Sequence, residues 1–226
     1  MKANNTTKTN RKLNKTATAL LFSAIFLGGC TSQQGGIKPV LKPTPSVTAS
    51  SKEALWVKRQ QQMLHMKSWN LDGKVAMRYK TDNWNFGVNW AQTGANNSII
   101  KIKNPFTGAT VALITQNNNK VSLQASDGKV YQDTNAEKLL KRQAGIDLPL
   151  SGLVYWARGV MAPQYKKGSV VLDASGRPKQ IIQENWLIKY PRYENASYNS
   201  LPKKIVLTRK ANAVYVKMIA KKWQSR

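Results

Sequence analysis

The sequence of 226 residues offers few side chains for covalent chemistry. It contains one cysteine and one histidine, so it can form no internal disulfide and no zinc site of the usual cysteine–histidine kind. A serine–histidine–aspartate triad would have to use His65, which lies between Leu64 and Met66 in a helical pattern. No Gly-x-Ser-x-Gly turn accompanies it, so we interpret His65 as a surface residue of a helix.

Paired carboxylates are the other catalytic arrangement that the composition allows, because the chain has 10 acidic residues. Several stand beside glycine, proline or other turn-forming residues, where capping explains them: Asp72, Asp127, Asp147 and Asp173. The sequence therefore predicts a protein that is not an enzyme and that holds no metal and no dissociable cofactor. A hydrolase of the cell envelope stays as an alternative, ranked after the two functions that are described below.

The single cysteine, Cys30, has the surroundings of a lipid attachment site. Residues 1–15 carry five basic residues and no acidic one, and residues 16–27 are apolar or small. This pattern is typical of a secretory signal, and the run is shorter than the roughly 20 apolar residues that span a bilayer. It ends in Leu27-Gly28-Gly29-Cys30, which resembles the bacterial lipobox.

We therefore predict a lipoprotein signal peptide over residues 1–29. The mature chain would begin at Cys30, with a thioether-linked diacylglycerol and an N-acyl chain on that residue. The alternative is an ordinary signal peptide with a chance cysteine near its end.

The chain has 36 basic and 10 acidic residues, a formal net charge of +26. Removing residues 1–29 takes away five basic residues and leaves 31 against 10, so the mature chain keeps a net charge of +21. This charge favours an anionic partner, and an exported lipoprotein meets membrane phospholipid rather than nucleic acid. The alternative is a solvated basic surface that only aids solubility. The basic residues that we expect to contact lipid or a protein partner are Lys101, Lys103, Lys203, Lys204, Arg209 and Lys210.

Residues 30–51 are rich in glycine, proline, serine, threonine and lysine, and their prolines prevent a regular helix. We expect them to form a flexible tether between the lipid anchor and a single folded domain over residues 52–226. Ser51 and Glu53 favour the start of a helix that runs to about Met66. Side chains at helical spacing follow this start: Leu55, Arg59, Gln62, Met63 and Met66.

After this helix the hydrophobic period changes from 3.6 to 2, which indicates half-buried antiparallel strands. Strand patterns occupy 75–79, 84–90, 98–103, 110–115, 120–125, 129–132, 168–172, 178–185, 186–190, 204–209 and 213–222. Two short helices interrupt them at 136–143, capped by Asp133 or Thr134 and ended by Gly145, and at 150–158. Because an open sheet of about 11 twisted strands curls, we predict a mainly β fold with some α (α+β), an incomplete antiparallel barrel.

The concave face of such a sheet needs a cover, which the short helices can supply as a lid. Large apolar side chains from both layers would then line a hydrophobic cavity suited to acyl chains. The residues that we expect there are Trp84, Phe86, Trp90, Leu139, Leu140, Leu153 and Trp156. The alternative is a fully packed core with no hollow.

An ordered set of short motifs resembles the LolB family of outer-membrane lipoprotein receptors. Its main pieces are 69–76 (WNLDGKVA), 90–94 (WAQTG), 104–108 (NPFTG), 145–150 (GIDLPL) and 155–159 (YWARG). Smaller pieces at Leu139-Leu140, Trp186 with Tyr190, Leu201-Pro202 and Trp223 complete the order. No single piece is specific, but together they cover nearly all of residues 52–226.

The resemblance implies a monomeric protein that is anchored by lipid in the inner leaflet of the outer membrane and faces the periplasm. It would accept lipoproteins from the soluble carrier LolA, shelter their acyl chains in the cavity, and release them into outer-membrane phospholipid. Thr31 agrees with this destination, because aspartate after the lipidated cysteine resembles an inner-membrane retention signal. The alternative is a lipid-anchored binding or assembly module of the envelope without transfer activity.

The resemblance also assigns a membrane-insertion loop to Pro105, Phe106 and Gly108. Family members commonly place leucine at the tip of the matching loop, so phenylalanine here is a departure. Proline and glycine indicate a tight turn, in which a large ring is unusual. We expect the Phe106 ring to enter the membrane, and the alternative is that it folds back onto the sheet.

Overall fold

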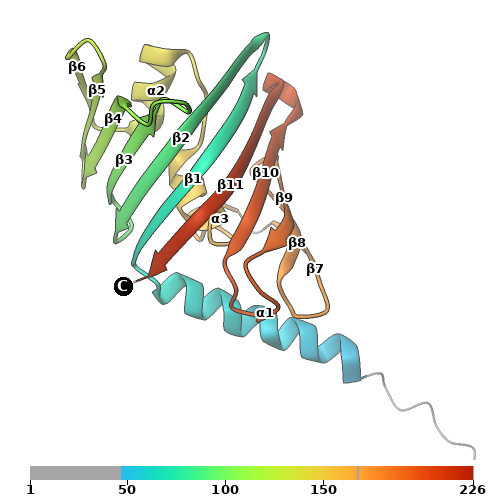
Figure 1. The fold of residues 1–226 in the computed structure, drawn as a ribbon. Helices are drawn as coiled ribbons and strands as arrows, with labels where there is room; N and C mark the ends of the chain where they lie inside the picture. Colours follow the sequence, from blue (N-terminus) through green and yellow to red (C-terminus); the bar gives the residue numbers. More distant parts are fainter. Residues whose placement is uncertain (1–46, 167, 226) are drawn as a thin grey trace, which may run out of the picture. The chain divides into compact units, whose positions relative to one another are not determined.

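The computed structural model describes residues 47–166 and 168–225, so Cys30 and the predicted signal peptide lie outside the described residues. The described residues belong to one compact unit, Pro43–Arg226 (Figure 1). The buried core lies within this unit, and we therefore expect it to fold without the residues that precede it. None of the described helices combines the length and apolar character needed to cross a bilayer.

Eleven strands form one sheet, whose order is β6-β5-β4-β3-β2-β1-β11-β10-β9-β8-β7. The strands are β1 (Ser68–Tyr79), β2 (Asp82–Thr93), β3 (Asn97–Lys103), β4 (Thr110–Asn117), β5 (Lys120–Ala125), β6 (Val130–Asp133), β7 (Ser169–Leu172), β8 (Pro178–Gln183), β9 (Trp186–Tyr193), β10 (Pro202–Arg209) and β11 (Val214–Ser225). All neighbours are antiparallel, and the edge strands β6 and β7 are not bonded to each other. The predicted incomplete barrel is confirmed.

Alternation of side chains gives the sheet one apolar face, which we call the inner face. Trp90 of β2 lies opposite Leu71 of β1 and Ile100 of β3, and all three are buried. Because strand side chains have a period of two, their sequence neighbours point to the outer face. This alternation is the signal that predicted the strands.

The central strands are longer than predicted. β1 begins at Ser68 instead of residue 75. Its first residue paired with β11 is Trp69, which lies opposite Ser225 at the end of that strand. Asparagine, aspartate and glycine are depleted in strands. The buried Trp69 and Leu71 alternate with Asn70 and Asp72, and these two polar residues made the start of the strand hard to recognise in the sequence.

Three α-helices and one 3₁₀ turn complete the described fold: α1 (Val47–His65), α2 (Ala136–Ala144), α3 (Leu150–Trp156) and η1 (Lys210–Asn212). The first helix begins at Val47 rather than at Ser51, so the last residues of the predicted tether are helical. Figure 1 shows α2 and α3 on the same face of the sheet, and α2 packs against β5, β6 and α3. These two helices form the predicted lid over the inner face.

The capping residue of α2 differs from the prediction. Asn135 is the N-cap, and its side chain accepts a hydrogen bond from the backbone N–H of Lys138. Asp133 instead accepts from the N–H groups of Thr134 and Asn135, which lowers the pKa of its carboxyl. Gly145 ends the helix in the left-handed region at φ 68°, as predicted.

Candidate functional site

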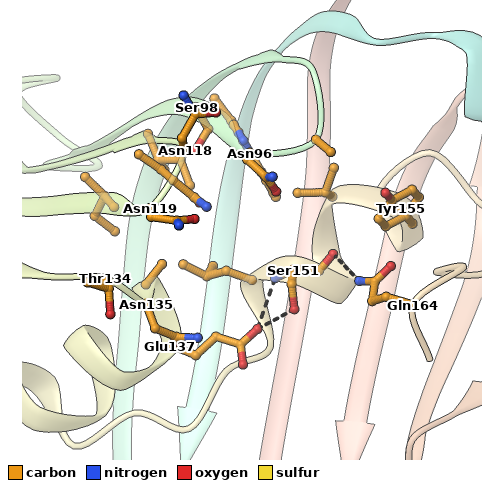
Figure 2. Close-up of a pocket in the computed structure, with 18 residues that line it drawn as sticks. Asn96, Ser98, Asn118, Asn119, Thr134, Asn135, Glu137, Ser151, Tyr155 and Gln164 are labelled. Carbon is orange, nitrogen blue, oxygen red and sulfur yellow. Dashed lines mark hydrogen bonds between the residues drawn. The ribbon is translucent and has the colours of Figure 1, made fainter.

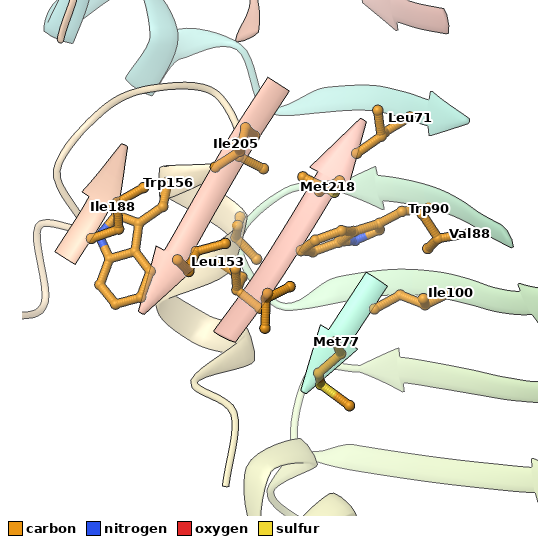
Figure 3. Close-up of a cluster of buried hydrophobic side chains, with 14 of the residues drawn as sticks. Leu71, Met77, Val88, Trp90, Ile100, Leu153, Trp156, Ile188, Ile205 and Met218 are labelled. Carbon is orange, nitrogen blue, oxygen red and sulfur yellow. The ribbon is translucent and has the colours of Figure 1, made fainter. Parts of the chain in front are cut away.

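An apolar pocket of about 310 Å³ lies between the inner face and the helical layer. Its sheet side comes from β1 to β5, β10 and β11, and its other side from α2, α3 and the segment between them. Every lining side chain is apolar. Figure 3 shows Val88, Trp90 and Ile100 of the sheet and Leu153 of α3 in this region. Five of the predicted cavity residues line the pocket: Trp84, Phe86, Trp90, Leu140 and Leu153.

The other two predicted cavity residues, Leu139 and Trp156, do not line this pocket. They are fully buried elsewhere, with 1% and 0% of their surfaces exposed. The Trp156 ring turns toward β8 and β9, where its Nε1 donates to Oε1 of Gln183 at 3.0 Å. Successive side chains of a helix point about 100° apart, so Leu139 and its neighbour Leu140 cannot both face the pocket.

A second pocket, of about 330 Å³, adjoins the apolar pocket. Polar and apolar residues line it in comparable measure, and we call it the polar pocket because the other pocket has no polar lining residue. The two pockets share four lining residues: Trp90, Ile100, Ile114 and Leu150. Figure 2 shows asparagine side chains from the turns of the sheet on one side and Glu137 and Ser151 on the other. Oε1 of Glu137 accepts from the backbone N–H of Ser151 at 3.1 Å and from its hydroxyl at 2.5 Å. The sequence did not reveal this pocket, because its asparagines are ordinary turn residues.

The loop between β3 and β4 places Phe106 at its tip with the residue 95% exposed. Oδ1 of Asn104 accepts from the backbone N–H of Phe106 at 2.9 Å and of Thr107 at 3.1 Å. Gly108 has a φ of 76°, a conformation that glycine adopts readily. The ring therefore extends into solvent from an ordered turn and does not fold back onto the sheet.

Two buried arginines join α1 to the end of α3. Arg59 is 0% exposed and donates to four backbone carbonyls, those of Arg158, Gly159, Tyr198 and Ser200. Arg158, 3% exposed, donates to the carbonyls of Met63, Met66 and Val154. Burial lowers the pKa of Arg158 to about 10, so the side chain stays charged at neutral pH. The helical spacing in the sequence predicted that Arg59 lies on the packed side of α1. It could not predict the backbone carbonyls that Arg59 binds, because these lie about 100 or more residues away in the sequence.

The outer face of the sheet carries a row of cations. The pairing registers place Lys103, Lys74, Lys204 and Arg192 side by side, with Gly87 and Ile219 between them. Lys103 immediately precedes the loop of Phe106. Two of the basic residues predicted to contact a partner have carboxylate neighbours within the chain, with Lys203 at 3.9 Å from Glu194 and Arg209 at 3.5 Å from Asp147.

Three of the side chains considered for catalysis contact residues that lie close to them in the sequence. His65 is exposed, and its Nδ1 lies 2.7 Å from the carbonyl oxygen of Gln61 in the same helix. Asp127 pairs with Lys129, and Asp173 with Arg177, each within a turn. In the described part of the chain, no three metal-ligating side chains come together.

Comparison with known proteins gives concordant results. The family model described as "Outer membrane lipoprotein LolB" matches residues 67–223. The chain is 32% identical to the outer-membrane lipoprotein LolB of Pseudomonas paraeruginosa over 171 residues, 76% of this chain and 81% of the relative. It is 32% identical to the LolB of Nitrosococcus oceani over 188 residues, 83% of this chain and 88% of the relative.

The fold resembles a solved structure of a putative outer membrane lipoprotein-sorting protein domain from Vibrio parahaemolyticus. The TM-score is 0.52 at 8% identity, over 79% of this chain and 93% of that one. At this identity the likeness extends to the fold alone.

Proposed function

Because the chain belongs to the LolB family of outer-membrane lipoproteins, we propose that it receives lipoproteins from the periplasmic carrier LolA and inserts them into the outer membrane. The family is one of lipoprotein-localisation proteins, and we propose no bond-changing step for this chain. It would act as a monomer anchored through acyl chains on Cys30, in the inner leaflet and facing the periplasm.

The observation that carries this proposal is the apolar pocket beneath α2 and α3. Moving an acyl chain from an apolar site into water costs about 0.8 kcal/mol per methylene group, so free dissociation between carrier and membrane is very slow. A pocket lined only by apolar side chains lets the chains pass from one sheltered site to another.

The proposal is tested by following a labelled triacylated lipoprotein from its complex with LolA onto residues 31–226 and then into liposomes. Movement of the label through both steps supports the proposal. A folded domain that takes no label from an active carrier contradicts it and leaves an anchored binding module as the better account.

Filling the pocket is expected to block the first step. Ala112 lines the pocket from β4, so Ala112→Phe places a ring where acyl chains would lie. We expect at least about tenfold less label on this variant, since overfilled apolar sites exclude ligands or strain the core. Val111→Phe is the matched control, because Val111 is the exposed neighbour on the other face of the same strand. Equal acceptance by both variants, with unchanged melting temperatures, would place the acyl chains elsewhere.

The row of cations suggests how the domain meets a membrane. Lys74 and Lys103 lie on the outer face, and Lys103 adjoins the Phe106 loop, so both can approach anionic head groups. With about 1 kcal/mol per lysine near an anionic surface, Lys74→Glu with Lys103→Glu should weaken vesicle binding at least roughly 30-fold at low salt. Co-sedimentation with phosphatidylglycerol vesicles measures this, with Lys58→Glu on the exposed side of α1 as the control. Binding that is insensitive to these changes and to salt makes the row a solvated surface only.

A further inference from the structure

The polar pocket continues the apolar pocket along the same four strands. In the apolar part, Trp90, Ile100, Ile114 and Leu123 form one row across β2 to β5. The next inward row, two residues further along each strand, is Gln92, Ser98, Gln116 and Val121. On β3 and β4 the inner face thus changes from the hydrocarbon of Ile100 and Ile114 to the hydroxyl of Ser98 and the amide of Gln116 within one step of the register, while Val121 of β5 stays apolar.

The helical layer changes in the same direction. The end of α2 and the segment after it contribute Ala144, Ile146 and Leu148 to the apolar pocket. The start of the same helix contributes Asn135 and Glu137 to the polar pocket. A ligand that occupies both pockets must therefore be apolar along one part and capable of hydrogen bonding along the other.

Several polar groups in this pocket have no protein partner. In the part of the chain that the structure describes, the side chains of Asn96, Ser98, Gln116 and Asn119 make no hydrogen bond to another protein group. Gln116 is half-buried and Ser98 is 8% exposed. Asn96 and Asn119 are exposed, so water reaches them. Amides and hydroxyls that are withdrawn from solvent are normally hydrogen-bonded, so the side chains of Ser98 and Gln116 are available for a ligand or for water in the pocket.

The charges around the pocket restrict the kind of ligand. The chain has 36 lysine and arginine residues, yet none lines either pocket among the described residues. The charged side chain at the polar pocket is the carboxylate of Glu137. A phosphate group would meet this carboxylate without a compensating cation, whereas neutral ester and amide groups would meet matching donors and acceptors.

We propose that the polar pocket binds the neutral linkage region of a triacylated lipoprotein while its acyl chains occupy the apolar pocket. This region contains two glyceryl ester carbonyls and the amide groups of the acylated cysteine and the residues after it, and it carries no charge. The pocket thereby favours lipoproteins over anionic phospholipids of equal chain length. The inference rests on the proposed function, since it assigns the head of the same ligand.

The test measures displacement of N-phenylnaphthylamine, an apolar dye, from residues 31–226. A synthetic triacylated cysteinyl-serine lipopeptide with an amidated C-terminus, which is uncharged, and phosphatidylglycerol with the same acyl chains serve as competitors. We expect the lipopeptide to displace the dye at a concentration at least about tenfold lower than phosphatidylglycerol does. The variant Ser98→Ala with Gln116→Leu should lose this preference and keep the affinity for the dye.

Thr115→Leu is the matched control, because Thr115 adjoins Gln116 on β4 and points to the opposite face. Asn119→Lys provides a second measurement at an exposed turn, where a substitution does not disturb the core. By adding a cation to the pocket, it should strengthen displacement by phosphatidylglycerol several-fold.

The outcomes separate the two proposals. If the lipopeptide displaces the dye from every variant with the same preference over phosphatidylglycerol, the polar pocket does not bind the linkage region and the transfer function stands. If neither dye nor lipopeptide binds the folded wild-type domain, the apolar site is refuted, and this inference falls with it.

Discussion

Replacing Phe106 with glutamate is expected to slow transfer into liposomes roughly 30- to 150-fold, because it removes about 2–3 kcal/mol of favourable ring burial in the bilayer. A negative charge at the same position adds a cost of membrane entry. Acceptance of lipoproteins from the carrier should be unchanged, since the pocket lies on the inner face and is not lined by this residue.

The fold should tolerate the change, because the Phe106 side chain extends into solvent. It is 95% exposed, and the loop is held by the side chain of Asn104 and the backbone of its neighbours. We therefore expect a melting temperature within about 2 °C of the wild type, as for surface substitutions in general.

Phe106→Leu is the matched control for this prediction. It keeps an apolar side chain at the tip and introduces the leucine that family members commonly have there. This variant should retain most of the transfer rate. Full transfer by Phe106→Glu would show that the tip does not enter the membrane. Loss of acceptance by the same variant would show that the loop contacts the carrier or the lipoprotein instead.

The sheet could be predicted because its signal is local. Trp84, Phe86, Val88 and Trp90 alternate with polar or small residues, and this period is visible within a single strand. The turn that carries Phe106 could also be located, because proline and glycine mark it, whereas the protrusion of the ring was expected from the family resemblance. In both cases a short stretch of sequence contains the physical cause.

The pockets could be predicted only in part, because they depend on contacts between distant elements. Periodicity identifies Trp156 as an apolar helix residue, but Gln183 on β8 decides which way its ring turns. The polar pocket depends on the register that places Ser98 beside Gln116 and on the packing of α2 above them. Asparagines that look like turn signals in the sequence become pocket residues only when these elements meet.

Replacing Arg59 with methionine is expected to destabilise the domain by about 3–5 kcal/mol and to lower its melting temperature by on the order of 10 °C. The guanidinium holds the carbonyls of Arg158, Tyr198 and Ser200 at 2.7–2.8 Å, and that of Gly159 at 3.3 Å. Methionine fills much of the same volume without a donor, so these buried carbonyls lose their partner.

The measurement is thermal unfolding of residues 31–226 followed by circular dichroism. Lys58→Met is the control, because Lys58 is the exposed neighbour on α1, and it should change the melting temperature by no more than about 2 °C. Arg59→Lys should lie between the two, since an ammonium keeps the charge but cannot reach four carbonyls in one plane. A melting temperature of Arg59→Met equal to that of the control would contradict the prediction.

The reason for two buried cations at this place lies in the ends of two helices. The last carbonyls of a helix have no partner within it and carry partial negative charge. Arg59 of α1 donates to the carbonyls of Arg158 and Gly159, just after α3, while Arg158 donates to those of Met63 and Met66, at the end of α1. Arg158 thus satisfies the end of α1, while Arg59 holds the turn that follows α3. Because removing either one loosens the same contact, Arg59→Met combined with Arg158→Met should cost clearly less than the sum of the single changes.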